Sequence, residues 1–134
     1  MTVIDALKAK LGGLPGIATA MDHGAELPAK SPALVIEWEA EQEAEPREQD
    51  GSLGLEIVAG VHLMVKYTSN PAAARNQAAG LARSARKELF ADYTLGGVCL
   101  ELELGRTEFG YILAGGEKWA LAKFSVIVNL KEAI

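Results

Sequence analysis

The first twelve residues carry the apolar spacing of an amphipathic helix. Thr2 is placed to cap its N-terminus, with Asp5 three residues later in a variant of the capping box. The apolar positions that follow recur at helical intervals and are Ile4, Leu7 and Leu11. Gly12 and Gly13 then end the segment, so we expect one short N-terminal helix.

A second and longer helix is predicted within residues 69–93, with its first helical position at Pro71. Asn70 is a favourable N-cap, and Pro71 falls at the first helical position, where its missing N–H costs nothing. The apolar stripe consists mostly of small residues, which permits close packing on a sheet: Ala74, Ala78, Leu81, Ala85 and Leu89.

Between and after these helices the pattern changes to a period of two, which is typical of half-buried β-strands. The alternating segments are residues 33–45, 55–67, 98–104 and 118–130, with a shorter candidate at 109–113. Residues 14–32 contain several prolines and glycines and are expected to form an irregular connection with at most one helical turn.

This order of elements predicts a single α+β domain over residues 1–134. We expect a mainly antiparallel sheet of four to five strands with both helices packed on one face. A polar, acidic hairpin loop at about 44–54 is expected to join the two longest early strands.

The composition agrees with one globular domain and indicates the kind of compartment in which it occurs. The chain is 49% hydrophobic and 23% charged, which argues against general disorder. The single cysteine, Cys99, cannot form an internal disulfide, and neither a signal peptide nor an apolar run long enough to span a bilayer is visible. We therefore expect a soluble protein of a reducing compartment.

The negative charge is concentrated in one segment. The net charge is −5, yet residues 37–50 alone hold seven acids against Arg47. General nucleic-acid binding through a basic surface is disfavoured by this balance. Alternation along one strand predicts that five carboxylates share one face: Glu37, Glu39, Glu41, Glu43 and Glu45.

This row of glutamates has two interpretations. It can be a solvated strand face that discourages edge-to-edge association. It can also be an acidic surface beside an anionic molecule that must not adhere. Metal binding is disfavoured because a straight strand makes the carboxylates diverge, and no glutamate differs from its neighbours as an acid and base pair requires.

The long helix carries a basic side opposite its apolar stripe, formed by Arg75, Arg83, Arg86 and Lys87. A solvated helix face is the ordinary interpretation. The alternative is an intersubunit surface of Arg75, Arg83 and Arg86, because the same chain supplies a complementary acidic strand. Such self-complementarity suits a head-to-tail ring.

We find no catalytic or cofactor motif in the sequence. His23, His62 and Cys99 stand without recognisable catalytic partners, and we expect structural roles for them. The Gly-Gly pairs lack the phosphate-loop lysine and the spacing of a dinucleotide fingerprint. Trp38 and Trp119 fall in strand patterns and are expected in the core. We therefore predict a non-enzymatic protein without metal or cofactor.

Four stretches in this order resemble the tail terminator and minor tail proteins of long-tailed phages and prophages. They are "GLEIVAGVHLMVKY", "NPAAARNQAAGLARSARKEL", "LGGVCLELELG" and "KWALAKFSVIVNL". The resemblance covers about residues 1–132. It is one of segment order and pattern: a short helix, a strand pair, an Arg- and Ala-rich helix, an "LGG" turn and closing strands.

The resemblance implies a structural protein of the virion tail, assembled in the host cytoplasm. It would form a ring, of six subunits, that caps the tail tube, stops its growth and offers the head connector a docking surface. DNA would pass through without specific binding, because an acidic lumen would repel its phosphates. The alternatives are an acidic protein-binding module or, with less support, a small α+β enzyme.

Overall fold

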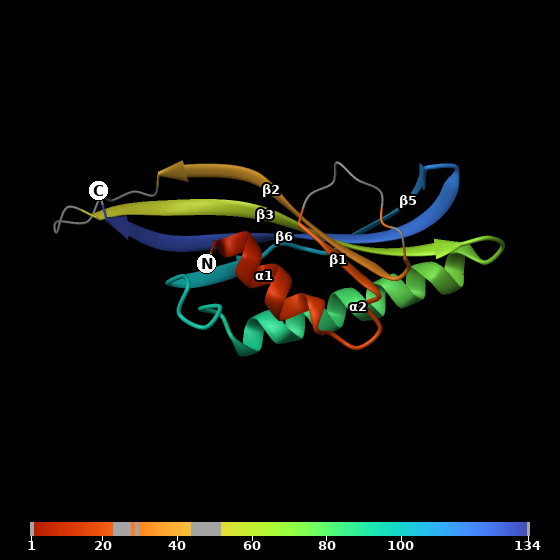
Figure 1. Ribbon diagram of the computed structural model, residues 1–134, viewed down its shortest axis with the longest axis horizontal. Helices are drawn as coiled ribbons and strands as arrows, with labels where there is room; N and C mark the ends of the chain where they lie inside the picture. The colour runs from red at the N-terminus through yellow and green to blue at the C-terminus, as the bar shows by residue number, and fades with distance from the viewer. Residues whose placement is uncertain (1, 23–27, 29, 44–51, 134) are drawn as a thin grey trace.

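The computed structural model describes residues 2–22, 28, 30–43 and 52–133. The elements in chain order are α1 (Val3–Gly12), β1 (Thr19–Met21), β2 (Ala33–Glu43), β3 (Ser52–Tyr67), α2 (Pro71–Ala91), β4 (Glu101–Leu104), β5 (Glu108–Ala114) and β6 (Glu117–Ala133). Figure 1 shows the strands as one elongated layer with α1 and α2 running beneath it. The predicted α+β class is confirmed.

Both helices begin where the sequence predicts. The Thr2 hydroxyl accepts a hydrogen bond from the Asp5 backbone N–H at 3.1 Å, and the Asn70 side chain accepts one from the Ala73 N–H at 3.0 Å. Each cap therefore satisfies one of the N–H groups that a helix start leaves without an internal partner.

The sheet has six strands in the order β1-β2-β3-β6-β4, and β5 also pairs with β6. All pairings are antiparallel except that of β1 with β2. The prediction of four to five strands was too low because residues 19–21, expected to be irregular, pair with residues 33–35. The shorter candidate at 109–113 does form a strand, since residues 101–104 and 108–114 pair in succession along the same edge of β6.

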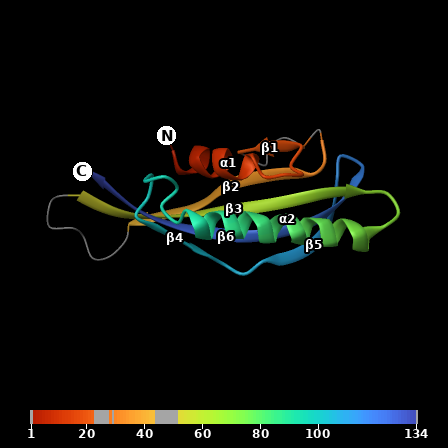
Figure 2. The same ribbon diagram turned by 90° about the horizontal axis from the view of Figure 1, so that it is seen from below.

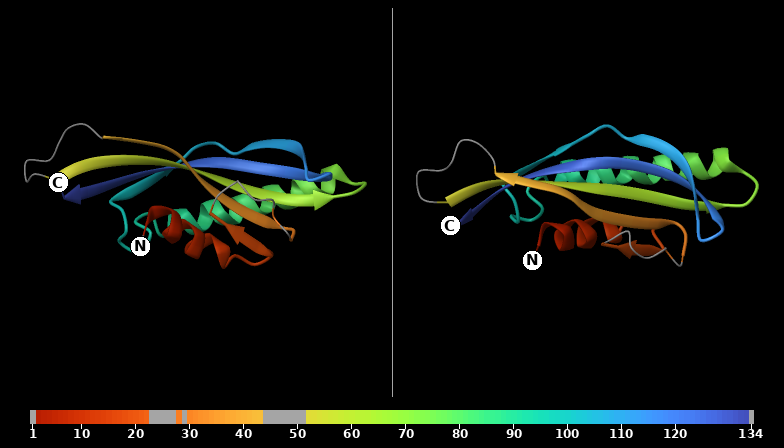
Figure 3. Two further views of the ribbon diagram at one scale, coloured as in Figure 1. Left: turned by 45° about the horizontal axis from the view of Figure 1, so that its top comes forward. Right: turned by 90° about the horizontal axis from the view of Figure 1, so that it is seen from above.

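The predicted acidic loop at 44–54 is shorter at its C-terminal end, because β3 begins at Ser52. Residues 44–51 lie outside the described part of the chain. Figure 3 shows that β2, β3 and β6 extend beyond the helices at the end of the sheet where β2 ends and β3 begins.

The main core lies between the helices and one alternate set of strand residues. Leu7 and Leu11 of α1 and Ala78, Ala85 and Leu89 of α2 are fully buried there. Their neighbours are alternate residues of the three central strands: Leu34, Ile36, Ile57, Ala59, Val61, Leu63, Phe124, Val126 and Val128. In Figure 2, α2 runs along β3 and β6, and α1 lies nearer β1 and β2. We call the sheet face formed by these strand residues the helix side and the other face the open side.

The open side has a smaller apolar cluster at one end. Ala33, Val35, Met64 and Trp119 are buried there, and the Lys66 ammonium lies 5.2 Å from the centre of the Trp119 ring. Trp119 is thus a core residue as predicted. Trp38 is not, because its side chain is 51% exposed at the part of β2 that extends past the helices.

The register of β2 against β3 shifts between Trp38 and Ala40. Trp38 pairs with Ala59 and Ala40 with Val58, so Glu39 is the extra residue of a β-bulge. A one-residue insertion moves every later side chain of that strand to the opposite face of the sheet. This bulge determines where the glutamates of β2 lie.

Candidate functional site

The open side of the sheet carries carboxylates from five strands. Directly paired residues of antiparallel strands share a face, so the register assigns each one. Glu56 and Glu101 flank Asn129, Glu103 pairs with Ile127, and Glu108 pairs with Lys123. We call the full set the acidic face: Glu37 and Glu39 of β2, Glu56 of β3, Glu101 and Glu103 of β4, Glu108 of β5 and Glu117 of β6.

The predicted row of five glutamates on one face was wrong. Glu37 and Glu39 lie on the open side, whereas Glu41 pairs with Ile57 and Glu43 with Leu55, which belong to the helix-side set of β3 residues. The bulge at Glu39 is the physical reason, because it reverses the alternation of β2. Glu45 lies outside the described residues.

The two open-side glutamates of β2 each have a basic neighbour. The Glu39 carboxylate lies 3.3 Å from the Lys123 ammonium, and the Glu37 carboxylate lies 3.7 Å from Nε2 of His62. Gly60 leaves room for this arrangement, since a Cβ there would come within 2.9 Å of Glu39 Oε1. The Lys123 ammonium thus relieves part of the repulsion within the acidic face.

His62 is the titratable group most affected by this environment. Burial lowers its pKa, and the nearby Lys123 lowers it further, while Glu37 and Glu39 act in the opposite direction. Within the described residues, His62 Nε2 is also a buried atom without a hydrogen-bond partner. The neutral imidazole is therefore favoured in the fold.

The basic residues of α2 divide into two kinds. Arg75 and Arg83 are exposed on the helix layer, away from the acidic face. Arg86 is half-buried, donates a hydrogen bond to the Gly105 carbonyl, and lies 5.3 Å from the centre of the Phe124 ring. Arg86 therefore links α2 to the connection between β4 and β5 and packs against the core of its own chain.

Within the described residues the remaining candidate groups form no reactive cluster. His23 lies outside the described part of the chain. Cys99 is buried, and burial raises the pKa of its thiol. Among the described residues, no group of three or more potential metal ligands comes together. No helix in the described part of the chain has the length and hydropathy needed to span a membrane.

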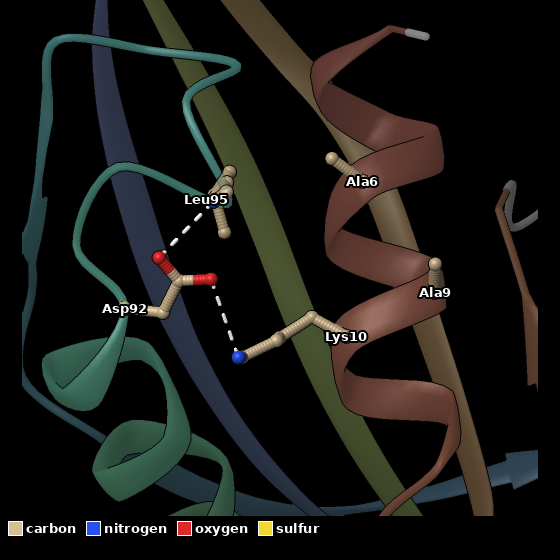
Figure 4. A pocket seen from close by; sticks show the side chains of 6 residues that line it. Ala6, Ala9, Lys10, Asp92 and Leu95 are labelled. Carbon is tan, nitrogen blue, oxygen red and sulfur yellow. Dashed lines mark hydrogen bonds and ion pairs between the residues drawn. The ribbon is translucent and has the colours of Figure 1, made fainter.

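A hollow of about 290 Å³ lies between α1 and the turn after α2, and an ion pair spans it. As Figure 4 shows, Lys10 of α1 reaches Asp92, with 3.2 Å between ammonium and carboxylate, and Asp92 also accepts the Gly96 N–H at 3.0 Å. These contacts lower the pKa of the Asp92 carboxyl, the Gly96 hydrogen bond most of all. These contacts thus connect α1 to the turn after α2.

Comparison of the chain with known protein families and with curated proteins finds no match. The interpretation of the surface therefore depends on its own geometry. Sequence reasoning identified Glu37 and Glu39 but missed five members of the acidic face, Glu56, Glu101, Glu103, Glu108 and Glu117. The alternation of Leu and Glu over residues 100–104 showed a two-sided strand, but pairing with β6 decides which face its glutamates share.

The lowered pKa of His62 predicts a pH dependence of stability. The unfolded chain holds His62 at its ordinary pKa of 6.5, so below that value it binds the proton more readily than the folded chain does. The contribution of His62 to the free energy of unfolding is therefore complete above pH 6.5 and is lost as the pH falls through the folded pKa. Urea unfolding at a series of pH values should show a smaller acid loss for His62→Gln than for wild type. Equal losses would contradict this account.

The two kinds of arginine predict different mutational costs. Arg86→Ala should lower the free energy of unfolding by about 1–3 kcal/mol, because it removes a charged hydrogen bond and a cation–π contact. Arg83→Ala is the matched control on the same helix and should stay within about 0.5 kcal/mol of wild type. Urea denaturation measures both free energies of unfolding. A cost of Arg86→Ala as small as that expected for the control would contradict the structural role of Arg86.

Proposed function

We propose that this chain is a ring-forming structural protein of a phage or prophage tail, of the tail terminator kind. In this role six copies cap the tail tube, stop its growth and present a docking surface to the head connector. The observation that carries the proposal is the separation of charge across the molecule. The sheet presents carboxylates on its open side, and the helix layer behind it exposes Arg75 and Arg83.

This separation suits a wall that lines a channel for DNA. In the proposed ring both helices pack on one face of the sheet and lie toward the outside, while the acidic face lines the lumen. Carboxylates repel phosphates, and at physiological ionic strength the repulsion extends about 8 Å. It therefore acts on DNA close to the wall, where adhesion would begin, and leaves passage along the axis free.

The partners under this proposal are further copies of the chain, the tail tube protein and the head connector. Assembly takes place in the host cytoplasm, and the protein stays in the virion tail. No cofactor or catalytic step is involved. A binding module for a basic protein partner is the alternative, since an acidic sheet face also offers a complementary surface to clustered Lys and Arg.

Tube length tests the terminator role. Tail tubes grown with and without this chain should be compared by electron microscopy. We expect tubes that overgrow in its absence and that stop at a fixed length, with a ring at the head-proximal end, in its presence. Normal length in both cases would reject the terminator role and favour the binding module.

Charge reversal tests the acidic lumen separately. Glu101→Lys with Glu103→Lys alters two exposed positions of the acidic face and should leave tubes and rings intact. DNA release from assembled particles should become slower or incomplete, because the wall then attracts phosphate. Glu88→Lys, on the exposed side of α2, is the matched control and should behave as wild type. Unchanged DNA release in the double variant would contradict the lumen assignment.

A further inference from the structure

An exposed apolar strip lies along the outer strand β5. Among the described strands, β5 pairs with β6 alone, and Phe109 and Tyr111 lie opposite the core residues Ala122 and Ala120. Phe109, Tyr111 and Leu113 therefore point to the helix side, where their side chains are 53%, 48% and 73% exposed. Lys118, also exposed, pairs with Leu113 and lies on the same side. We call these four residues the edge patch.

Strips of this kind are uncommon on a protein that acts alone. An unpaired strand edge with large exposed apolar side chains is a template for association, and proteins that do not use it usually blunt it with charge. Tyr111 has one aromatic neighbour, Tyr67, with ring centres 6.0 Å apart. Leu113 and Phe109 remain more than half exposed.

A complementary groove lies on the helix side at the other end of the sheet. It has a volume of about 270 Å³ between the start of α1 and the part of the sheet that extends past the helices. Its apolar walls include Val3, Leu55, Ile57, Val98 and Leu130. Trp38 and Glu41 line it from β2, and Glu41 is on this side only because the bulge reverses the alternation of the strand.

The two surfaces cannot meet within one molecule. Lys118 lies at the start of β6 and Leu130 near its end, twelve residues apart, which corresponds to about 40 Å along the strand. One surface projects apolar side chains beside a lysine, and the other is an apolar groove with a carboxylate. Their shape and charge are therefore complementary between two copies of the chain.

We propose that the edge patch of one copy docks in the groove of the next, with Phe109 and Leu113 against Trp38 and with Lys118 beside Glu41. This contact joins two different surfaces, so each added copy leaves one of each free, and the series closes when the rotation between copies completes a circle. It deepens the proposed ring function and rests on that function for its role in the tail. The association itself is measured independently.

The test uses two variants that each remove one surface. Leu113→Glu places a charge in the edge patch, and Trp38→Glu places one in the groove, both at positions at least half exposed so that the core is retained. Sedimentation velocity should show concentration-dependent association of wild type and weakening by about 100-fold for each variant alone. Phe90→Glu, at a 65% exposed position outside both surfaces, is the control and should associate as wild type. Circular dichroism checks that every variant is folded.

Mixing the two variants is the decisive step. Trp38→Glu chains keep the edge patch and Leu113→Glu chains keep the groove, so the mixture should form heterodimers that grow no further.

Charge exchange adds a second criterion. Glu41→Lys should weaken association about tenfold, and combining it with Lys118→Glu should restore it. A mixture without heterodimers, a variant that associates as wild type, or a wild type that stays monomeric at millimolar concentration would overturn the proposal.

Failure of this contact is distinguishable from failure of the terminator role. If tubes end at fixed length with a ring although both surface variants are present, the role stands and the contact is wrong. If the variants lose association as described but tube length never depends on the chain, the contact stands and the role is wrong.

Discussion

The pairing of β3 with β6 is the constraint on which the rest of the molecule depends. The two strands run antiparallel in continuous register from Ser52 opposite Ala133 to Tyr67 opposite Lys118. One alternate set of their residues packs with both helices in the main core, and the other set faces the open side. Because a slip of one residue would exchange the two sets, the buried core fixes the register, and the register in turn fixes the acidic face. Because β4 and β5 both pair with β6, the same register determines on which face each of their side chains lies.

The bulge at Glu39 interrupts the alternation of β2 and decides on which face of the sheet its glutamates lie. It leaves Glu37 and Glu39 on the open side, beside His62 and Lys123, and turns Glu41 to the helix side. Bulges are often found where a strand must redirect a side chain. Here the redirection divides one acidic segment between two surfaces, the acidic face and the groove at Trp38.

The helices could be predicted well from the sequence because their signals are local. The N-caps at Thr2 and Asn70 and the small-residue stripe of α2 act within a few residues, and the structure confirms them. The arrangement of the sheet could be predicted less fully from the sequence. Alternation identifies a strand but not its neighbour, so the parallel pairing of β1 and the shared face of Glu56 and Glu101 could not be deduced. A bulge leaves no signal in the period itself, and for that reason the division of the glutamates was missed. The exposure of Trp38 was missed because the alternation does not show that β2 extends past the helices.

The central claim is that the acidic face lines a channel while the helices lie outside it. Electron cryomicroscopy of the chain assembled on a tail tube, at a resolution that separates strands from helices, tests this claim most directly. The account predicts a ring in which β3, β6 and β4 turn their open side toward the axis and α2 lies on the outer surface. A ring with α2 lining the axis and the acidic face outside would contradict it.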